Sequence, residues 1–282
     1  MTLATLSDVL KPAMAEGYAV PGLVCLGWED MRAYVMAAHA ERAPVILQAG
    51  PSCRAHTPLP VLGAMFRTLA NSVDVPVVAH LDHGHSIDDC KAALDAGFTS
   101  VMFDGSNLPL AQNIDMTGQV AALAHGSGAS CEGEIGFVGY AGGVGSTGTD
   151  PDEAARFARD TGIDAMAVSV GNLHLQRTHG HGLDLARIRA IEALSPVPLV
   201  IHGGSGVAPE QRLELSAKTR ICKFNIGTEL RMAFGSALRA AVARDPDRFD
   251  RIALLHETEG PVFEAARKAI RSLGANGRAK SS

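Results

Sequence analysis

The chain alternates between short apolar runs and longer segments in which apolar residues recur at helical spacing. The apolar runs are rich in β-branched residues, which favour strands. They cover residues 18–26, 44–49, 75–82, 100–105, 129–136, 165–171, 198–203 and 222–227. Because short runs that are mostly apolar on both faces are typical of strands buried in a parallel sheet, the pattern predicts eight such strands.

The segments between these strands predict helices. Residues 28–43, 87–98 and 151–162 carry their apolar positions at the spacing of an amphipathic helix. Eight alternations of strand and helix favour an α/β fold of the TIM (β/α)8 barrel type over an open doubly wound sheet, since no GxGxxG follows the first strand.

Two further helices are expected outside the repeating pattern, an extra N-terminal helix over residues 6–17 and a C-terminal helix over residues 260–274. The tail that follows residue 274 is expected to fray. No linker, repeat or low-complexity tract interrupts the chain. We therefore expect residues 1–282 to form a single barrel domain.

The composition excludes several classes of partner. The net charge of -5 is spread without a block of like charges, so neither nucleic acid nor an anionic membrane is an expected partner. No apolar stretch reaches the length of a membrane span, and the N-terminus lacks the features of a signal peptide. The five scattered cysteines, without CxxC spacing, fit reduced thiols. We expect a cytoplasmic protein.

Polar residues gather at the carboxyl ends of the predicted strands, where barrel enzymes place their active sites. The residues at these ends are Asp82, His83, Glu132, Glu134, His174, His202 and Asn225. His174 and His202 are separated by about one strand–helix unit, so they should stand on neighbouring strands. Three neutral imidazoles, from His83, His174 and His202, together predict a zinc site, although any one of these histidines taken alone is more often a satisfied core residue.

The remaining polar residues near these ends are harder to place. Glu132 and Glu134 point the same way at strand period 2, so one of them is expected near the metal and the other in a charge pair. His80 is expected to pack outward. His179 and His181 lie in a Gly-containing stretch that favours a mobile loop over a metal site.

Two Gly-rich turns follow the last two strands. They read HGGSG at residues 202–206 and NIGTE at residues 225–229. Backbone N–H groups and a hydroxyl at the start of a helix can bind a phosphate at this position of a barrel, although each turn alone could be a plain tight turn. Together they predict a phosphate site beside the metal.

At this point the sequence resembles the class II, metal-dependent fructose- and tagatose-bisphosphate aldolase family. The similar stretches are GYAVP (17–21), PVI (44–46), HLDHG (80–84), AQNI (111–114), EGEIG (132–136), TGIDAMAVSVGNLH (161–174), HGGSG (202–206) and ICKFNIGTEL (221–230). They follow one another in order over most of the chain. The resemblance implies reversible cleavage of a ketose phosphate, either a bisphosphate or a 1-phosphate, to dihydroxyacetone phosphate and an aldehyde.

The resemblance also implies roles for individual residues. Zinc would be held by His83, His174 and His202, with Glu134 as an accessory ligand. Asp82 would be the acid/base for the C4 hydroxyl and Asn225 a contact to the enediolate. The donor phosphate would lie on backbone and hydroxyl groups of Gly203, Gly204, Ser205, Gly227 and Thr228. A monovalent cation near the phosphate and a homo-oligomer, dimer or tetramer, are implied as well.

Two alternative functions stay open. One is an aldolase that uses an unphosphorylated hydroxyketone donor, and the other is a non-catalytic barrel that binds sugar phosphates. A Schiff-base mechanism through Lys223 is possible but has no support in the pattern.

The chain also departs from the family pattern. The loop over residues 137–150 lacks the family's acidic cluster, and Tyr140 is its one good proton donor. Leu175 replaces the Gly that usually follows the histidine after the sixth strand. Val24 and Phe263 stand where the family tends to be polar or basic toward the distal phosphate, although Arg267 and Arg271 could compensate. We therefore expect fructose 1,6-bisphosphate to be a poor substrate.

Overall fold

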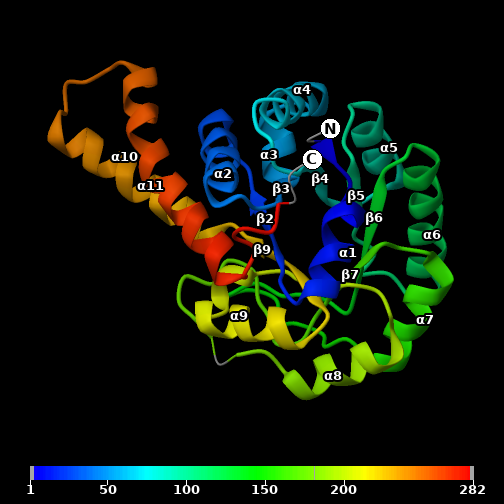
Figure 1. The fold of residues 1–282 in the computed structure, drawn as a ribbon. Helices are drawn as coiled ribbons and strands as arrows, with labels where there is room; N and C mark the ends of the chain where they lie inside the picture. The colour runs from blue at the N-terminus through cyan, green and yellow to red at the C-terminus, as the bar shows by residue number, and fades with distance from the viewer. Residues whose placement is uncertain (1–2, 181, 280–282) are drawn as a thin grey trace.

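A computed structural model describes residues 3–180 and 182–279, and its centre is a closed barrel of eight parallel strands. The strands pair in the order β4-β3-β2-β9-β8-β7-β6-β5, and pairing of β4 with β5 closes the ring. Helices surround the barrel, with α2 to α9 following one another around it (Figure 1). The predicted TIM barrel is confirmed.

All eight predicted strands are present, each within or near its expected range. They are β2 (Val20–Val24), β3 (Val45–Ala49), β4 (Val77–Gly84), β5 (Ser100–Phe103), β6 (Ser130–Ile135), β7 (Ala165–Val168), β8 (Leu199–Ile201) and β9 (Ile221–Ile226). A two-residue strand, β1 (Leu3–Ala4), pairs with the start of β4 at the amino end of the barrel. The strands are buried almost throughout, which explains their strong signal in the sequence.

The three helices expected from apolar spacing are present as α2 (Trp28–Glu41), α5 (Ile87–Asp95) and α7 (Pro151–Thr161). The outer ring also contains α3 (Pro51–His56), α4 (Leu59–Ala70), α6 (Leu110–Gly126), α8 (Leu185–Leu194), the short 3₁₀ turn η1 (Gly204–Gly206) and α9 (Pro209–Lys218). Among the described residues, no helix is both long and apolar enough to cross a membrane.

The two extra helices are confirmed, with one difference in length. The N-terminal helix α1 (Leu6–Glu16) begins at a capping box between Thr5 and Asp8 and ends at Gly17, whose φ of 69° suits a residue without Cβ. The C-terminal helix α11 (Arg251–Ser272) begins well before the expected residue 260 and contains Pro261. With α10 (Thr228–Arg244) it forms a hairpin that projects from the barrel (Figure 1).

The expectation that the chain frays after residue 274 is wrong for the described part of the tail. Ala275 is fully buried. The backbone N–H groups of Gly277 and Ala279 donate to the carbonyl oxygens of Glu41 and Arg42, at 2.8 Å each. These hydrogen bonds tie the tail to the end of α2.

The barrel interior holds a polar cluster as well as apolar side chains. Lys223 Nζ on β9 donates to Glu132 Oε2 on β6 at 2.7 Å and lies 3.4 Å from His80 Nε2 on β4. His80 Nδ1 lies 2.8 Å from Ser100 Oγ. All four side chains are buried. The expectation that His80 packs outward is therefore wrong, since it lies inside the barrel below the histidines at the strand ends.

Candidate active site

A bulge at the end of β4 allows two consecutive residues to face the same cavity. The pairing between β4 and β5 shifts register between Leu81 and Gly84, and His83 has a positive φ of 51°. In a regular strand Asp82 and His83 would point to opposite faces. Because of the bulge, both line the cavity of about 300 Å³ at the carboxyl end of the barrel.

The bulge brings His83 next to His174, which follows β7, and His202, which follows β8. The ring centroid of His83 lies 4.8 Å from that of His202 and 5.4 Å from that of His174. The centroids of His174 and His202 are 5.6 Å apart. One nitrogen from each ring falls within 4.8 Å of the others. The structure thus brings together the three histidines proposed as metal ligands from the sequence.

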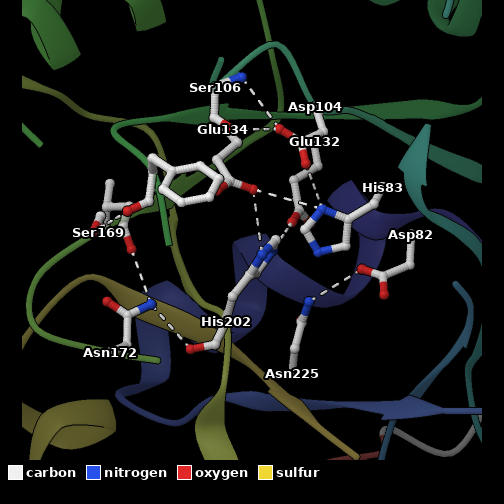
Figure 2. A network of polar contacts seen from close by, with 12 residues as sticks. Asp82, His83, Asp104, Ser106, Glu132, Glu134, Ser169, Asn172, His202 and Asn225 are labelled. Atoms are coloured by element: carbon white, nitrogen blue, oxygen red, sulfur yellow. Dashed lines mark hydrogen bonds and ion pairs between the residues drawn. The ribbon is translucent and has the colours of Figure 1, made fainter. Parts of the chain in front are cut away.

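Carboxylates orient two of these rings (Figure 2). His83 Nδ1 lies 2.7 Å from Asp104 Oδ2, and His202 Nε2 lies 3.2 Å from Glu132 Oε1. Each carboxylate engages one ring nitrogen and leaves the other for a ligand, as second partners of metal-binding histidines do. Asp104 follows β5 in the motif FDG. Its position at a strand end was a signal that the sequence analysis did not use.

Two buried atoms beside the histidines have no hydrogen-bond partner in the described residues. They are His202 Nδ1 and Glu134 Oε2, which lie 3.4 Å apart. Leaving buried polar atoms unpaired is unfavourable, so this pair indicates a ligand that both could bind. A cation fits, because it accepts a lone pair from each, and Glu134 also forms a second group with His83 and Asp104.

The ionisable groups in the site have strongly perturbed pKa values. Burial works against a charge on His83, but Asp82, Asp104 and Glu134 outweigh it and raise its pKa to about 10. Burial, together with the charge on His83, lowers the pKa of His174 to about 4. Burial also raises the pKa of Glu134 to about 8. Such shifts cluster at functional sites.

Asp82 and Asn225 lie side by side next to the histidines. Asn225 Nδ2 donates to Asp82 Oδ1 at 3.3 Å across the barrel mouth, from β9 to β4 (Figure 2). Asp82 lines the site cavity, although it is only 5% exposed. Asn225 Oδ1 is buried without a hydrogen-bond partner in the described residues. Both Asp82 and Asn225 line the site cavity.

The two predicted Gly-rich turns meet beside this pair. Gly203 has a φ of 66°, and a Cβ there would lie 2.0 Å from the Leu173 carbonyl oxygen, so only Gly fits. Ser205 Oγ accepts from the Gly227 N–H at 3.3 Å, which joins the two turns. Gly203, Ser205, Gly227 and Thr228 line the site cavity. Gly204 instead packs against β9, where a Cβ would lie 2.9 Å from the Asn225 carbonyl oxygen.

The loop after β6 covers one side of the cavity. Tyr140 stacks on His174 with ring centroids 4.9 Å apart. Tyr140 is 46% exposed. Burial of its hydroxyl raises the pKa of Tyr140. Leu175, the departure from the usual Gly, adopts a φ of 58°, a conformation that favours Gly. The loop therefore brings one hydroxyl to the histidines without an acidic cluster.

The residues expected to replace the distal basic group lie elsewhere. Arg267 and Arg271 form ion pairs with Glu41, at 2.6 and 2.8 Å, on the outside of the barrel. Phe263 lines a different cavity, together with residues of α2. Arg231 on α10, which the sequence analysis missed, lines the site cavity instead. The site cavity therefore has a basic side chain, and it comes from Arg231 and not from Arg267 or Arg271.

The predicted mobile stretch that contains His179 and His181 is not seen to contribute a ligand to the site. His179 is exposed and does not belong to either group of potential metal ligands found among the described residues. His181 lies outside the described residues. The three histidines at the strand ends are the ones that the structure gathers.

Comparisons with known proteins agree with the fold and identify the family. The family model described as fructose-bisphosphate aldolase class-II matches residues 4–278. The chain is 36% identical to a 6-phospho-5-dehydro-2-deoxy-D-gluconate aldolase from Shouchella clausii, over 100% of this chain and 98% of the relative. It is 33% identical to a fructose-bisphosphate aldolase from Geobacillus stearothermophilus, over 99% of each chain.

A solved structure gives the same assignment. The crystal structure of the YdjI aldolase from Escherichia coli K12 matches with a TM-score of 0.86 and 30% identity, over 99% of this chain and 100% of that one. Since aldolases of this class depend on a metal ion, the gathered histidines are where such an ion would be expected. Because the family model and the relatives match almost the whole chain, the chain belongs to the class II fructose-bisphosphate aldolase family.

Proposed function

We propose that this protein is a zinc-dependent aldolase that reversibly cleaves a ketose phosphate to dihydroxyacetone phosphate and an aldehyde. The observation that carries the proposal is the set of three imidazoles with ring nitrogens within 4.8 Å, next to the buried carboxylate of Asp82. A barrel that only bound sugar phosphates would not need this carboxylate.

The donor set supports zinc as the metal. Three imidazole nitrogens with a carboxylate nearby suit Zn²⁺ better than Mg²⁺, which prefers oxygen ligands. We propose His83, His174 and His202 as ligands and Glu134 as the accessory ligand. When bound, the ion supplies Lewis-acid stabilisation of negative charge on the substrate oxygens.

Asp82 is proposed as the acid/base of the cleavage step. Its carboxylate takes the proton of the hydroxyl on the carbon that becomes the aldehyde, while the neighbouring carbon–carbon bond breaks and its electron pair passes to the donor fragment. Asn225 donates to Asp82 Oδ1 at 3.3 Å and so holds this carboxylate in place. Asn225 also lines the cavity, and its side chain is proposed to contact the enediolate.

The Gly-rich turns are proposed to bind the donor phosphate. Gly203, Ser205, Gly227 and Thr228 line the cavity and offer backbone N–H groups and two hydroxyls at the start of η1 and α10. Gly204 allows the close approach of this turn to β9. A monovalent cation beside the phosphate stays part of the proposal.

We also propose a homo-oligomer in which the α10–α11 hairpin packs on a second copy. Phe249 is 96% exposed and Ile252 is 80% exposed at the connection between these helices. Two apolar side chains at the tip of a projecting hairpin favour contact with a partner. Light scattering should give the mass of at least a dimer, and a monomer at micromolar concentration would refute this part.

The central experiment combines metal analysis with substitution. Each of the variants His83→Ala, His174→Ala and His202→Ala should lose most of the zinc, which we expect at about one per chain, whereas the exposed control His179→Ala should retain it. Asp82→Ala should retain metal and fold but lose about 10²- to 10⁴-fold in cleavage. Full zinc retention in all three variants would refute the site.

Product analysis separates the alternatives. Formation of product from dihydroxyacetone phosphate supports the proposal, and formation only from unphosphorylated dihydroxyacetone supports the hydroxyketone aldolase. Binding of sugar phosphates without any turnover would identify a non-catalytic barrel.

A further inference from the structure

Arg54 on α3 contacts the backbone at the irregular end of β4. Its Nη1 donates to the Asp82 carbonyl oxygen at 2.6 Å and to the Ala49 carbonyl oxygen at 3.1 Å. Its Nη2 donates to the His83 carbonyl oxygen at 3.0 Å. Asp82 is the proposed acid/base and His83 is one of the proposed metal ligands. One guanidinium thus holds the main chain of both residues.

Arg54 acts from outside the site cavity. Ser52 of the same helix lines this cavity, whereas Arg54 is not among the described residues that line it. The guanidinium is therefore not placed to touch a substrate. Any effect of Arg54 on the reaction has to pass through the backbone that it holds.

The place of Arg54 follows from the end of the β3–β4 pairing. The last paired residues are Ala49 and Leu81, and the chain after β3 then turns into α3. The carbonyl groups of the next two residues of β4 lie beyond the last N–H groups of β3. Since Asp82 is buried, its carbonyl group would be costly to leave without a donor. Arg54 supplies the donors that β3 no longer provides.

The bulge that Arg54 contacts is strained. His83 has a φ of 51°, which is unfavourable for a residue with a Cβ. Strained backbone of this kind persists only where the surrounding contacts over-determine it. Asp104 holds the His83 ring at 2.7 Å, and Arg54 holds the His83 carbonyl oxygen. The planar guanidinium suits this task, because its N–H donors point in fixed directions.

On the basis of the proposed zinc site and aldolase function, we propose that Arg54 is a positioning residue that holds the β4 bulge in the conformation that directs both Asp82 and His83 into the cavity. In a regular strand these two side chains would point to opposite faces. Loss of the three hydrogen bonds should therefore weaken zinc binding and catalysis together. The donor phosphate turns, which follow β8 and β9, should be unaffected.

The first measurements do not depend on activity. Arg54→Met removes the donors but keeps an unbranched side chain. Its zinc affinity, measured by competition with a chromophoric chelator, should fall about ten- to a hundred-fold, as is typical when a residue that supports a metal ligand is lost. In the metal-free protein, amide hydrogen exchange over residues 82–84 should become about tenfold faster or more. Arg54→Lys should fall between Arg54→Met and the wild type.

The second measurement separates kcat from KM in the synthetic direction. The substrate names of two relatives suggest the acceptor aldehydes. Retro-aldol cleavage of 6-phospho-5-dehydro-2-deoxy-D-gluconate breaks the C3–C4 bond and yields dihydroxyacetone phosphate and 3-oxopropanoate. Cleavage of fructose 1,6-bisphosphate yields dihydroxyacetone phosphate and glyceraldehyde 3-phosphate.

The kinetic prediction is a loss of kcat without a matching change in KM. With saturating zinc and the better of the two aldehydes, Arg54→Met should lower kcat about ten- to a hundred-fold. The KM for dihydroxyacetone phosphate should stay within about threefold, because the groups that bind its phosphate are not moved. A residue that bound the phosphate itself would show the opposite pattern.

Arg220→Met is the matched control. Arg220 Nη1 donates to the Ser195 carbonyl oxygen at 2.7 Å, directly before β9 begins and so at the amino end of the barrel. Its substitution removes the same kind of hydrogen bond far from the strand ends that form the site. This variant should keep the zinc affinity, the exchange rates over residues 82–84 and the kcat of the wild type.

Three results would overturn the inference. One is a zinc affinity and an exchange rate in Arg54→Met that equal those of the wild type. Another is a raised KM for dihydroxyacetone phosphate with unchanged kcat, which would make Arg54 a substrate contact. A third is the same set of losses in Arg220→Met, which would indicate general destabilisation.

Two further outcomes are also decisive. If Arg54→Met does not fold, the zinc affinity and the exchange rate are measured in Arg54→Lys, and wild-type values there would overturn the inference. A wild type that binds zinc but forms no product from either aldehyde would count against the proposed function. The exchange rates of the metal-free variants would still decide whether Arg54 holds the bulge.

Discussion

The ion pair between Lys223 and Glu132 inside the barrel should be one of the most sensitive points of the fold. Both side chains have no exposed surface, and Lys223 Nζ lies 2.7 Å from Glu132 Oε2. Lys223→Met would fill a similar volume but leave the Glu132 carboxylate buried without its cation. Removing one partner of such a pair typically destabilises a protein by about 3–5 kcal/mol.

The prediction is best measured as a shift of the urea unfolding midpoint in metal-free protein, because bound metal would add its own stabilisation. With a urea dependence of about 3 kcal/mol per molar, a loss of about 3–5 kcal/mol lowers the midpoint by about 1–1.7 M. The double variant Lys223→Met, Glu132→Gln should recover most of this loss, because no unpaired charge remains buried.

Lys218→Met is the matched control, since Lys218 forms an exposed ion pair with Glu214 at 2.9 Å. It should change the stability by less than about 1 kcal/mol. The reasoning would be refuted if the urea midpoint of Lys223→Met lay within about 0.2 M of the midpoint of the control. On the same urea dependence, this margin corresponds to about 0.6 kcal/mol. Lys223 is paired with Glu132 and does not line the site cavity, which argues against it as the Schiff-base lysine of the alternative mechanism.

Three further predictions concern single residues. Leu175→Gly should raise stability by up to about 1 kcal/mol in thermal unfolding, because Leu175 has a φ of 58° and is 51% exposed; a loss would contradict this. Tyr140→Phe should lower the rate of proton exchange at the donor carbon of dihydroxyacetone phosphate with zinc content unchanged, and an unchanged rate would exclude Tyr140 as the proton donor of the loop. Asp164→Asn should destabilise the protein by about 1–3 kcal/mol at pH 7, since Asp164 accepts hydrogen bonds from the Ser7 hydroxyl at 2.6 Å and the Cys131 N–H at 2.8 Å.

The pH dependence of the Asp164→Asn variant follows from the sign of the shift. Burial works to raise the pKa of Asp164, but its hydrogen bonds outweigh burial and lower the pKa below the ordinary value. The folded state therefore binds its proton less readily than the unfolded state, and the carboxylate stabilises the fold above a pH of about 4. The difference between wild type and variant should shrink as the pH falls through the lowered pKa, and a constant difference would refute the assignment.

The sequence predicts the barrel well because its strands are buried on both faces and so read as uninterrupted apolar runs. The convergence of His83, His174 and His202 also follows from the sequence, because parallel strands of a barrel end at one rim. The orientation of His80 does not. Alternation counted back from His83 turns His80 outward, but the bulge at His83 gives Asp82 and His80 the same, inward direction.

The distal side of the site could not be predicted for a different reason. Arg231 lies one turn into a helix, and how far a helical side chain reaches over a neighbouring loop depends on packing that the sequence does not encode locally. The expected place of Phe263 rests on a resemblance along α11, and a shift by a few residues turns a helical side chain to another face. The paired partner of His83, Asp104, shows the opposite case, because its place at a strand end was readable but was not used.

The most direct test of the account is a metal-depletion experiment that follows the consumption of dihydroxyacetone phosphate with 3-oxopropanoate or glyceraldehyde 3-phosphate. Chelator-treated protein should stay folded, since the barrel core does not depend on an ion at its rim, and should lose its activity. Addition of about one equivalent of zinc per chain should restore it. Undiminished activity of the metal-free protein would contradict the assignment of His83, His174 and His202 as the centre of the reaction.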